Sequence, residues 1–279
     1  MNITILANRD VASNFAINLL LPRLNKHHLT IFLSTKVGKQ TNKPTALLEL
    51  AFYEQELFNQ VLSPKINAQH SEQTGFKTFE QLHDIVDGGV RELNNINTEE
   101  GFNLFNSSQP DLVISIRYGV IIKYNVINVP RNGVINLHSG ILPDYRGVMA
   151  TFWAMYKKEQ RIGMTLHYIS DGTIDTGRVI DKSSIDVNYQ KSYLWHVLEL
   201  YKEGTQLIIN VVNKINQNLT ITSSAQEEGG DYYTFPTTAE IETFINAGNS
   251  IISELEVNEF INQYYCFNVK LSELTQPEQ

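Results

Sequence analysis

The stretch NITILANRDVASNFAINLLLPRLNKHHLTIFL, residues 2–33, decides the fold class of this chain. It begins with the short apolar run Asn2–Ala7, which is typical of a buried strand, and a polar turn follows at residues 8–10. Apolar residues at helical spacing then predict a helix that ends near Pro22, and Leu29–Leu33 predicts a second strand. A strand, a helix and a strand this close together form a βαβ unit, which indicates a parallel sheet with a right-handed crossover.

The rest of the chain alternates helical patterns with continuous apolar runs of the kind found inside parallel sheets. We therefore predict an α/β fold, with a Rossmann-like, mostly parallel sheet flanked by helices. The predicted helices cover residues 44–63, 79–86, 148–158 and 193–216, and the predicted strands cover residues 111–117, 133–138, 163–169 and 178–186.

The composition and residue pattern of the sequence change near residue 218. We therefore predict a main domain, residues 1–217, and a small C-terminal α/β extension, residues 218–279. The extension should contain a short Thr/Ile strand, an acidic turn and a helix capped by Thr237 or Thr238. It carries one basic residue, Lys270, against ten acidic residues, a net charge of −9. Such a surface repels phosphate backbones, so we expect no nucleic acid partner.

Composition restricts the class of protein further. The chain has 279 residues, is 42% apolar, and contains one cysteine, Cys266, so it can form neither an intramolecular disulfide nor a thiolate metal site. No other metal site is signalled. The first residues lack the basic region of a signal peptide, and no apolar run approaches the about 20 residues of a membrane-spanning helix. We expect a soluble cytoplasmic protein with no membrane contact.

The first stretch that carries chemistry is NLHSGILPDYRG, residues 136–147, at the end of a predicted strand. An open α/β sheet binds its ligands at such strand ends. Because side chains alternate along a strand, Asn136 and His138 point to the same side. A carboxamide and an imidazole there can bind a carbonyl oxygen and move a proton. Taken alone, this short pattern also fits a histidine bonded to the backbone of a tight loop.

The second stretch is DGTIDTG, residues 171–177, a polar loop between two predicted strands. A carboxylate from this loop can face His138, fix its orientation and stabilise its positive charge. By itself the loop fits an ordinary hairpin turn equally well, with an aspartate that bonds the local backbone.

In combination and in this order, the two stretches resemble the folate-dependent formyltransferase family over roughly residues 1–215. That family includes glycinamide ribonucleotide, methionyl-tRNA and nucleotide-sugar N-formyltransferases. The resemblance implies that Asn136, His138 and Asp175 form the catalytic trio and that N10-formyltetrahydrofolate is the co-substrate. It also implies a reaction in which an amine attacks the formyl carbon while Asn136 and His138 stabilise the oxyanion.

The segment around Gly119 is similar to the pterin-binding region of the same family. The resemblance assigns cofactor binding to five residues: Arg117, Tyr118, Gly119, Val120 and Asp171. Without the resemblance this segment would be a buried strand followed by a turn.

Differences between this sequence and some of these relatives reduce the number of molecules expected to accept the formyl group. The turn at residues 8–10 lacks the glycines of the glycinamide ribonucleotide enzymes, and the acidic extension disfavours tRNA. The segment DYYTFPT, residues 231–237, resembles enzymes that act on dTDP-linked amino sugars. The expected substrate-binding residues are Lys77, Tyr145, Arg146, Tyr232 and Tyr233.

The resemblance thus implies formyl transfer to a dTDP-linked amino-dideoxysugar, with dTDP-4-amino-4,6-dideoxyglucose preferred, for O-antigen or other lipopolysaccharide and surface polysaccharide synthesis. Two alternatives remain open, a methionyl-tRNA formyltransferase and a non-catalytic homologue that binds folate or nucleotide sugars. The apolar residues between positions 250 and 268 suit either packing on the main domain or a homodimer contact.

Overall fold

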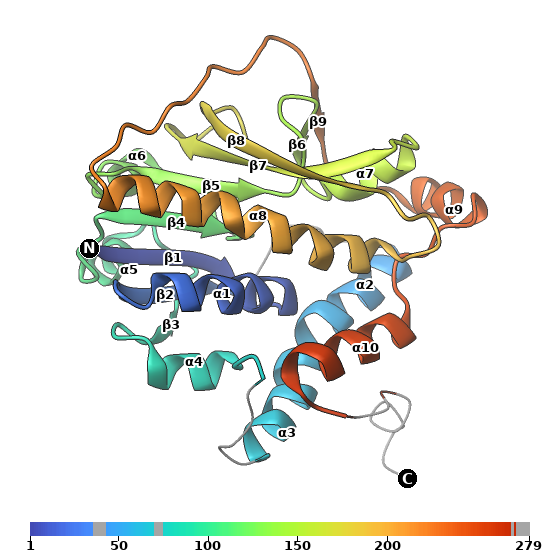
Figure 1. Cartoon of the computed structure of the whole chain (residues 1–279). Coiled ribbons are helices and arrows are strands. Elements are labelled where there is room, and N and C mark those ends of the chain that lie inside the picture. The colour runs from blue at the N-terminus through green and yellow to red at the C-terminus, as the bar shows by residue number, and fades with distance from the viewer. Residues whose placement is uncertain (36–42, 70–74, 269–270, 272–279) are drawn as a thin grey trace.

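The computed structural model describes residues 1–35, 43–69, 75–268 and 271. Its centre is a seven-stranded sheet in the order β3-β2-β1-β4-β5-β7-β8, with helices on both faces (Figure 1). Strands β3, β2, β1, β4 and β5 run parallel, whereas β7 and β8 are antiparallel to their neighbours. The predicted α/β fold with a mostly parallel sheet is confirmed.

The elements follow one another in the expected alternation, and a second sheet contains only β6 and β9. The strands are β1 (Asn2–Asn8), β2 (His28–Ser34), β3 (Val90–Glu92), β4 (Leu112–Ile116), β5 (Val134–His138), β6 (Tyr145–Gly147), β7 (Arg161–Ile169), β8 (Val179–Asp186) and β9 (Asp231–Tyr233). The helices are α1 (Val11–Leu24), α2 (Thr45–Ala51), the π-helical η1 (Phe52–Leu62), α3 (Ser63–Ala68), α4 (Phe79–Ile85), α5 (Glu99–Asn106), α6 (Tyr124–Ile127), α7 (Ala150–Tyr156), α8 (Tyr193–Asn216), α9 (Thr238–Asn246) and α10 (Glu254–Tyr265).

Alternating side chains of the central strands build a core on each face of the sheet. On β1, Ile5 packs with the buried residues of α1 and α8, whereas Leu6 packs on the opposite face with Phe105 of α5 and Val126 of α6. Both faces of a parallel sheet must be covered, and this explains the near-continuous apolar strands.

Helix α1 ends at Leu24, near Pro22 as predicted, because a proline in the last turn removes one backbone hydrogen bond without preventing the turn. One local prediction was wrong. The Thr/Ile segment after Asn218 is not a strand: only Ser224 meets a strand edge, through an isolated bridge to Val179. A strand needs a partner along its length, and residues 219–223 have none among the described residues.

Helix α10 packs against α1 through aromatic side chains. Phe15 of α1 is fully buried, and its ring centroid lies 4.9 Å from that of Phe260 and 4.7 Å from that of Tyr264. Nearby, the Tyr265 hydroxyl donates to Asn14 Oδ1 at 2.6 Å. Packing within the chain therefore accounts for much of the apolar 250–268 region. No helix among the described residues is long and apolar enough to cross a membrane.

We expect Phe15→Ala to lower the free energy of unfolding by about 3–5 kcal/mol, because it removes a buried ring that joins α1 to α10. Urea unfolding followed by circular dichroism measures the loss. The control is Leu255→Ala on α10, where a side chain that is 67% exposed should change stability by no more than about 0.5 kcal/mol. Equal losses in the two variants would contradict this account of how α10 docks.

Candidate active site

The polar side chains of the candidate active site lie together where β5 and β7 are paired. The antiparallel register pairs Asn136 with His167 and His138 with Thr165, so Asn136, His138 and His167 come from one small patch of the sheet. Asn136 and His138 stand at the carboxyl end of β5, the end at which an open α/β sheet places its ligands.

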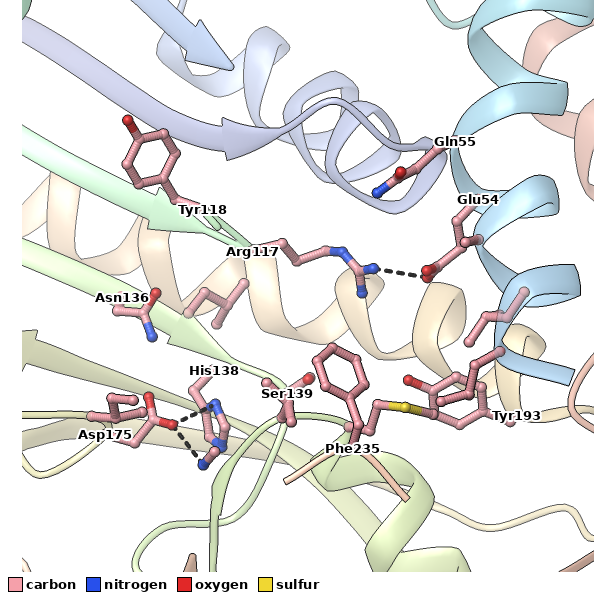
Figure 2. Close-up of a pocket in the computed structure, with 18 of the residues that line it drawn as sticks. Glu54, Gln55, Arg117, Tyr118, Asn136, His138, Ser139, Asp175, Tyr193 and Phe235 are labelled. Carbon is pink, nitrogen blue, oxygen red and sulfur yellow. Dashed lines mark hydrogen bonds and ion pairs between the residues drawn. The ribbon is translucent and has the colours of Figure 1, made fainter. Parts of the chain in front are cut away.

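Asp175 lies between two histidines. Its Oδ2 is 3.4 Å from His138 Nδ1, and its Oδ1 is 3.4 Å from His167 Nε2. The Asp175 side chain is only 9% exposed, and those of His138 and His167 are 7% and 2% exposed. Figure 2 shows the Asp175 carboxylate turned toward His138. The structure therefore brings together the three residues of the predicted trio.

Burial alone would raise the pKa of Asp175, but its positive surroundings outweigh that effect. The charge of His138, the hydrogen bond and charge of His167, and a hydrogen bond from Gly147 N at 2.9 Å lower the pKa to about 2. The Asp175 carboxylate therefore stays charged at neutral pH and stabilises positive charge on the adjacent rings.

His167 was not predicted from the sequence. Its Nδ1 donates to the Tyr168 carbonyl oxygen at 2.9 Å, and its Nε2 lies 3.1 Å from Asn136 Nδ2. Because Nδ1 carries a hydrogen, Nε2 of the neutral ring accepts from Asn136 Nδ2, whereas Nε2 of the protonated ring donates to Asp175 Oδ1. The signal that could have found His167 is the pairing of β5 with β7, which is not visible in either motif alone.

The backbone around Asp175 is also specialised. Asp175 has φ 56°, in the left-handed region that non-glycine residues seldom occupy. Gly147, which donates to its carboxylate, has φ 96°, and a Cβ there would lie 2.1 Å from the Tyr233 carbonyl oxygen of β9. Glycine is thus required at the point where β6 meets β9 and supports Asp175.

Two cavities meet at these residues. The smaller, of about 270 Å³, lies toward α2 and η1, and the larger, of about 580 Å³, lies toward residues 118–122 and 168–174. Asn136 and Asp175 line both cavities, whereas His138 lines the smaller one and His167 the larger. A ligand in either cavity therefore has access to the same carboxamide and carboxylate.

The predicted cofactor-binding residues divide between the two cavities. Gly119, Val120 and Asp171 line the larger one, together with Tyr168 and Ser170, and Tyr118 lines both. Arg117 instead lines the smaller cavity. Its backbone lies in the left-handed region, with φ 57°.

Arg117 is engaged by two acidic side chains from other parts of the chain. Its Nε donates to Asp10 Oδ2 and its Nη2 to Glu54 Oε1, each at 2.8 Å. Burial raises the pKa of Glu54 to about 7, although the charge of Arg117 opposes this rise. Glu54 comes from η1 and lines the smaller cavity, as Figure 2 shows across from His138. No motif in the sequence points to Glu54.

The predicted substrate-binding residues are mostly occupied by the protein itself. Tyr145 donates its hydroxyl to Glu159 at 2.7 Å, and Arg146 donates to the Gly230 carbonyl oxygen at 2.9 Å. The backbone of Lys77 is bonded to Asn18, and Lys77, Tyr145 and Arg146 are not among the residues lining the two cavities.

The two tyrosines of the C-terminal segment have different surroundings. Tyr232 is 51% exposed and lines the larger cavity. Tyr233 is 9% exposed and stacks on Tyr145 and Trp153, with ring centroids 5.6 Å and 5.0 Å apart. Tyr145 and Trp153 therefore already cover the Tyr233 ring, whereas the Tyr232 ring is open to a ligand.

Because the folded protein holds the pKa of Asp175 at about 2, below its ordinary 3.8, the carboxylate stabilises the fold above about pH 4. This contribution is lost as the pH falls from 4 to about 2. We expect wild type to exceed Asp175→Asn by about 2 kcal/mol in free energy of unfolding near pH 6, and the gap to narrow in acid. Denaturant titrations at several pH values measure it.

The control for this prediction is Asp186→Asn, which removes a carboxylate that is 89% exposed and pairs with Arg161 at the surface. Its effect should stay below about 1 kcal/mol at every pH. A gap between wild type and Asp175→Asn that did not change between pH 6 and acid would show that the two histidines do not stabilise the carboxylate.

Comparisons with known proteins bear on this arrangement. Methionyl-tRNA formyltransferase from Thermodesulfovibrio yellowstonii is 31% identical over 113 residues, which cover 40% of this chain and 36% of that protein. The chain spans about a third to just over half of the length of the curated relatives it matches. Those matches alone therefore say nothing about the remainder of either protein.

Solved structures share the fold at low sequence identity. A sugar N-formyltransferase from Shewanella sp. has a TM-score of 0.55 and 14% identity, and the match covers 91% of each chain. A 4-N formyltransferase from Francisella tularensis has a TM-score of 0.55 and 16% identity, covering 91% of this chain and 90% of that one.

A family model gives the decisive match. The model described as Formyl transferase matches residues 61–212, which include β5, β7 and the loop that carries Asp175. This match covers more than half of the sequence, and so the chain belongs to the formyl transferase family.

Proposed function

We propose that this protein is an N-formyltransferase that moves the formyl group of N10-formyltetrahydrofolate to the amino group of a dTDP-linked amino-dideoxysugar. The observation that carries the proposal is that Asn136 and Asp175 line both cavities. A donor in one cavity and an acceptor in the other would have their reacting atoms next to the same two side chains, as group transfer requires.

The larger cavity suits the folate donor. It is lined by the glycine-containing segment 118–122 on one side and by Tyr168–Ile174 on the other, and Tyr232 stands at it as an exposed aromatic ring. Apolar and aromatic side chains of this kind accommodate a flat heterocycle. When bound there, the folate supplies an activated formyl group at the wall formed by Asn136 and Asp175.

The smaller cavity suits the acceptor. Figure 2 shows the Arg117–Glu54 ion pair across from His138 and Asp175. Tyr193 and Tyr201 also line this cavity. Hydroxyl and charged groups can hold a hydroxylated sugar ring by hydrogen bonds. The amine of such a sugar would then face the catalytic trio.

The trio can perform the steps of the reaction. Asn136 donates from Nδ2 to the formyl oxygen as that oxygen becomes negative. His138 donates from Nε2 to the Tyr145 carbonyl oxygen at 2.6 Å, which leaves Nδ1 for proton transfer beside Asp175. Asp175 stabilises the protonated ring and so allows His138 to take a proton from the amine and return it to the leaving nitrogen.

Several features support a sugar nucleotide as the acceptor, with dTDP-4-amino-4,6-dideoxyglucose preferred. The C-terminal segment has the Tyr232–Thr237 pattern described above, and its region carries a net charge of −9 that disfavours tRNA. Two proteins of the same fold are named as a sugar N-formyltransferase and a 4-N formyltransferase. The product would serve O-antigen or other surface polysaccharide synthesis in the cytoplasm.

The organisation of the chain forms part of this proposal. Residues 1–217 would be the catalytic domain, and residues 218–279 would complete its substrate side or contribute to a homodimer.

A second candidate is formylation of methionyl-tRNA, because curated relatives that match part of this chain carry that name. Incubating the protein with formyl donor and either charged initiator tRNA or a panel of dTDP-3-amino and dTDP-4-amino sugars separates the two. Turnover of the tRNA and none of the sugars would replace our proposal with the second candidate.

We expect Asn136→Ala to lower kcat for formyl transfer by about 100- to 1000-fold, because it removes a donor to the developing oxyanion. The rate is followed by the formation of tetrahydrofolate. Asn128→Ala, which changes an exposed asparagine after α6, is the control and should retain full activity. A loss confined to KM would contradict a role in the transition state.

The two cavities should respond separately to substitution. Glu54→Gln should raise KM for the acceptor by about tenfold, because it weakens a charged hydrogen-bonding group, and should leave KM for folate unchanged. Val120→Trp should raise KM for folate and leave KM for the acceptor unchanged, because a large side chain fills part of the larger cavity. Initial-rate measurements with each substrate varied in turn test both variants. If Glu54→Gln raised KM for folate and Val120→Trp raised KM for the acceptor, folate would bind in the smaller cavity and the acceptor in the larger one.

A further inference from the structure

The loop that carries Asp175 is held by a side chain from outside the family match. Gln226 Nε2 donates to two backbone carbonyl oxygens, those of Asp175 and Gly177, each at 2.8 Å. Gln226 lies beyond residue 212, where the match to the family model ends. The two hydrogens of one amide nitrogen thus bridge the residues on either side of Thr176.

The register of the adjoining backbone fixes where Gln226 stands. Val179 and Ser224 exchange two backbone hydrogen bonds, of 2.9 Å and 2.8 Å. One residue earlier on each segment, Arg178 Nε donates to Ser223 Oγ at 3.0 Å. The C-terminal segment is therefore aligned with the Asp175 loop by contacts that do not involve Gln226 itself.

Further along the same C-terminal region, β9 supports the Asp175 carboxylate from the other side. Tyr233 of β9 accepts a hydrogen bond from Val148 N at 3.0 Å, and β9 pairs with Gly147 of β6. Gly147 N in turn donates to Asp175 Oδ2 at 2.9 Å. Residues 223–233 thus act on the Asp175 backbone through Gln226 and on its carboxylate through Gly147.

We propose that Gln226 is a positioning residue for formyl transfer, which holds Asp175 in its left-handed conformation so that the carboxylate faces His138 and His167. The inference rests on the proposed function only for its activity assays. It assigns to the C-terminal segment a part in the reaction centre.

The conformation of Asp175 explains why such support is needed. A non-glycine residue at φ 56° is strained, and it persists only where its surroundings hold it. At the next fixed point, a Cβ on Gly177 would lie 1.7 Å from the Tyr168 carbonyl oxygen, so the chain is packed closely there. Residues 171–174 before Asp175 and residue 176 after it are exposed. Without Gln226, Asp175 can relax to an ordinary φ and turn its carboxylate away from the histidines.

The test compares Gln226→Met, which keeps the length of the side chain and removes both donor hydrogens, with Glu227→Gln at the exposed neighbouring position. We expect kcat of Gln226→Met to fall by about 10- to 100-fold with both KM values within about twofold of wild type, because small displacements of catalytic groups cost this much. Glu227→Gln should match wild type. An unchanged kcat in Gln226→Met would overturn the inference.

A double-mutant cycle distinguishes positioning from general support of the fold. In an Asp175→Asn background, Gln226→Met should cause almost no further loss of kcat, because the group that it positions is already removed. Independent losses that multiply would mean that Gln226 acts elsewhere and would overturn the proposal.

A second readout does not need an acceptor. Nitrogen NMR of the histidine rings should show shifted imidazole signals for His138 and His167 in Gln226→Met and unshifted signals in Glu227→Gln. Unshifted signals in both variants would overturn the inference. If the wild-type protein transfers no formyl group to any amine, the proposed function fails, and the NMR result still decides the role of Gln226.

Discussion

The pairing of the buried Asp175 carboxylate with two histidines is the interaction on which the candidate active site depends. The carboxylate stands between two imidazoles, each 3.4 Å away, and accepts a backbone hydrogen bond from Gly147. A buried charge is tolerated only where partners surround it, so its partners must be held firmly. The β5–β7 pairing holds the histidines, and the pairing of β6 with β9 holds Gly147. The main features around the site can be understood as support for this one charge.

The sequence predicted the parts of this site that come from continuous stretches. Alternation along one strand placed Asn136 beside His138, and a seven-residue loop contained Asp175. The buried strands were equally visible, because a parallel sheet covered on both faces requires unbroken apolar runs. The 3.6-residue period of α8 gave its two ends at Tyr193 and Asn216 as the structure has them.

The parts that the sequence did not reveal depend on pairing between distant segments. His167 joins the site through the register of β5 with β7, and Glu54 through the approach of η1 to Arg117. The aromatic pair Tyr232 and Tyr233 shows the same limit. The pattern marks both rings, but only the folded chain shows that Tyr145 and Trp153 already cover Tyr233 while Tyr232 stays exposed.

The wall shared by the two cavities has a consequence for the order of events in a transferase. Asn136 and Asp175 face both sides, so the described site offers one catalytic set for two ligands. Donor and acceptor would then have to occupy the protein at the same time, and the group would pass directly between them. Such an enzyme follows sequential kinetics through a ternary complex and carries no covalently modified form between two half-reactions.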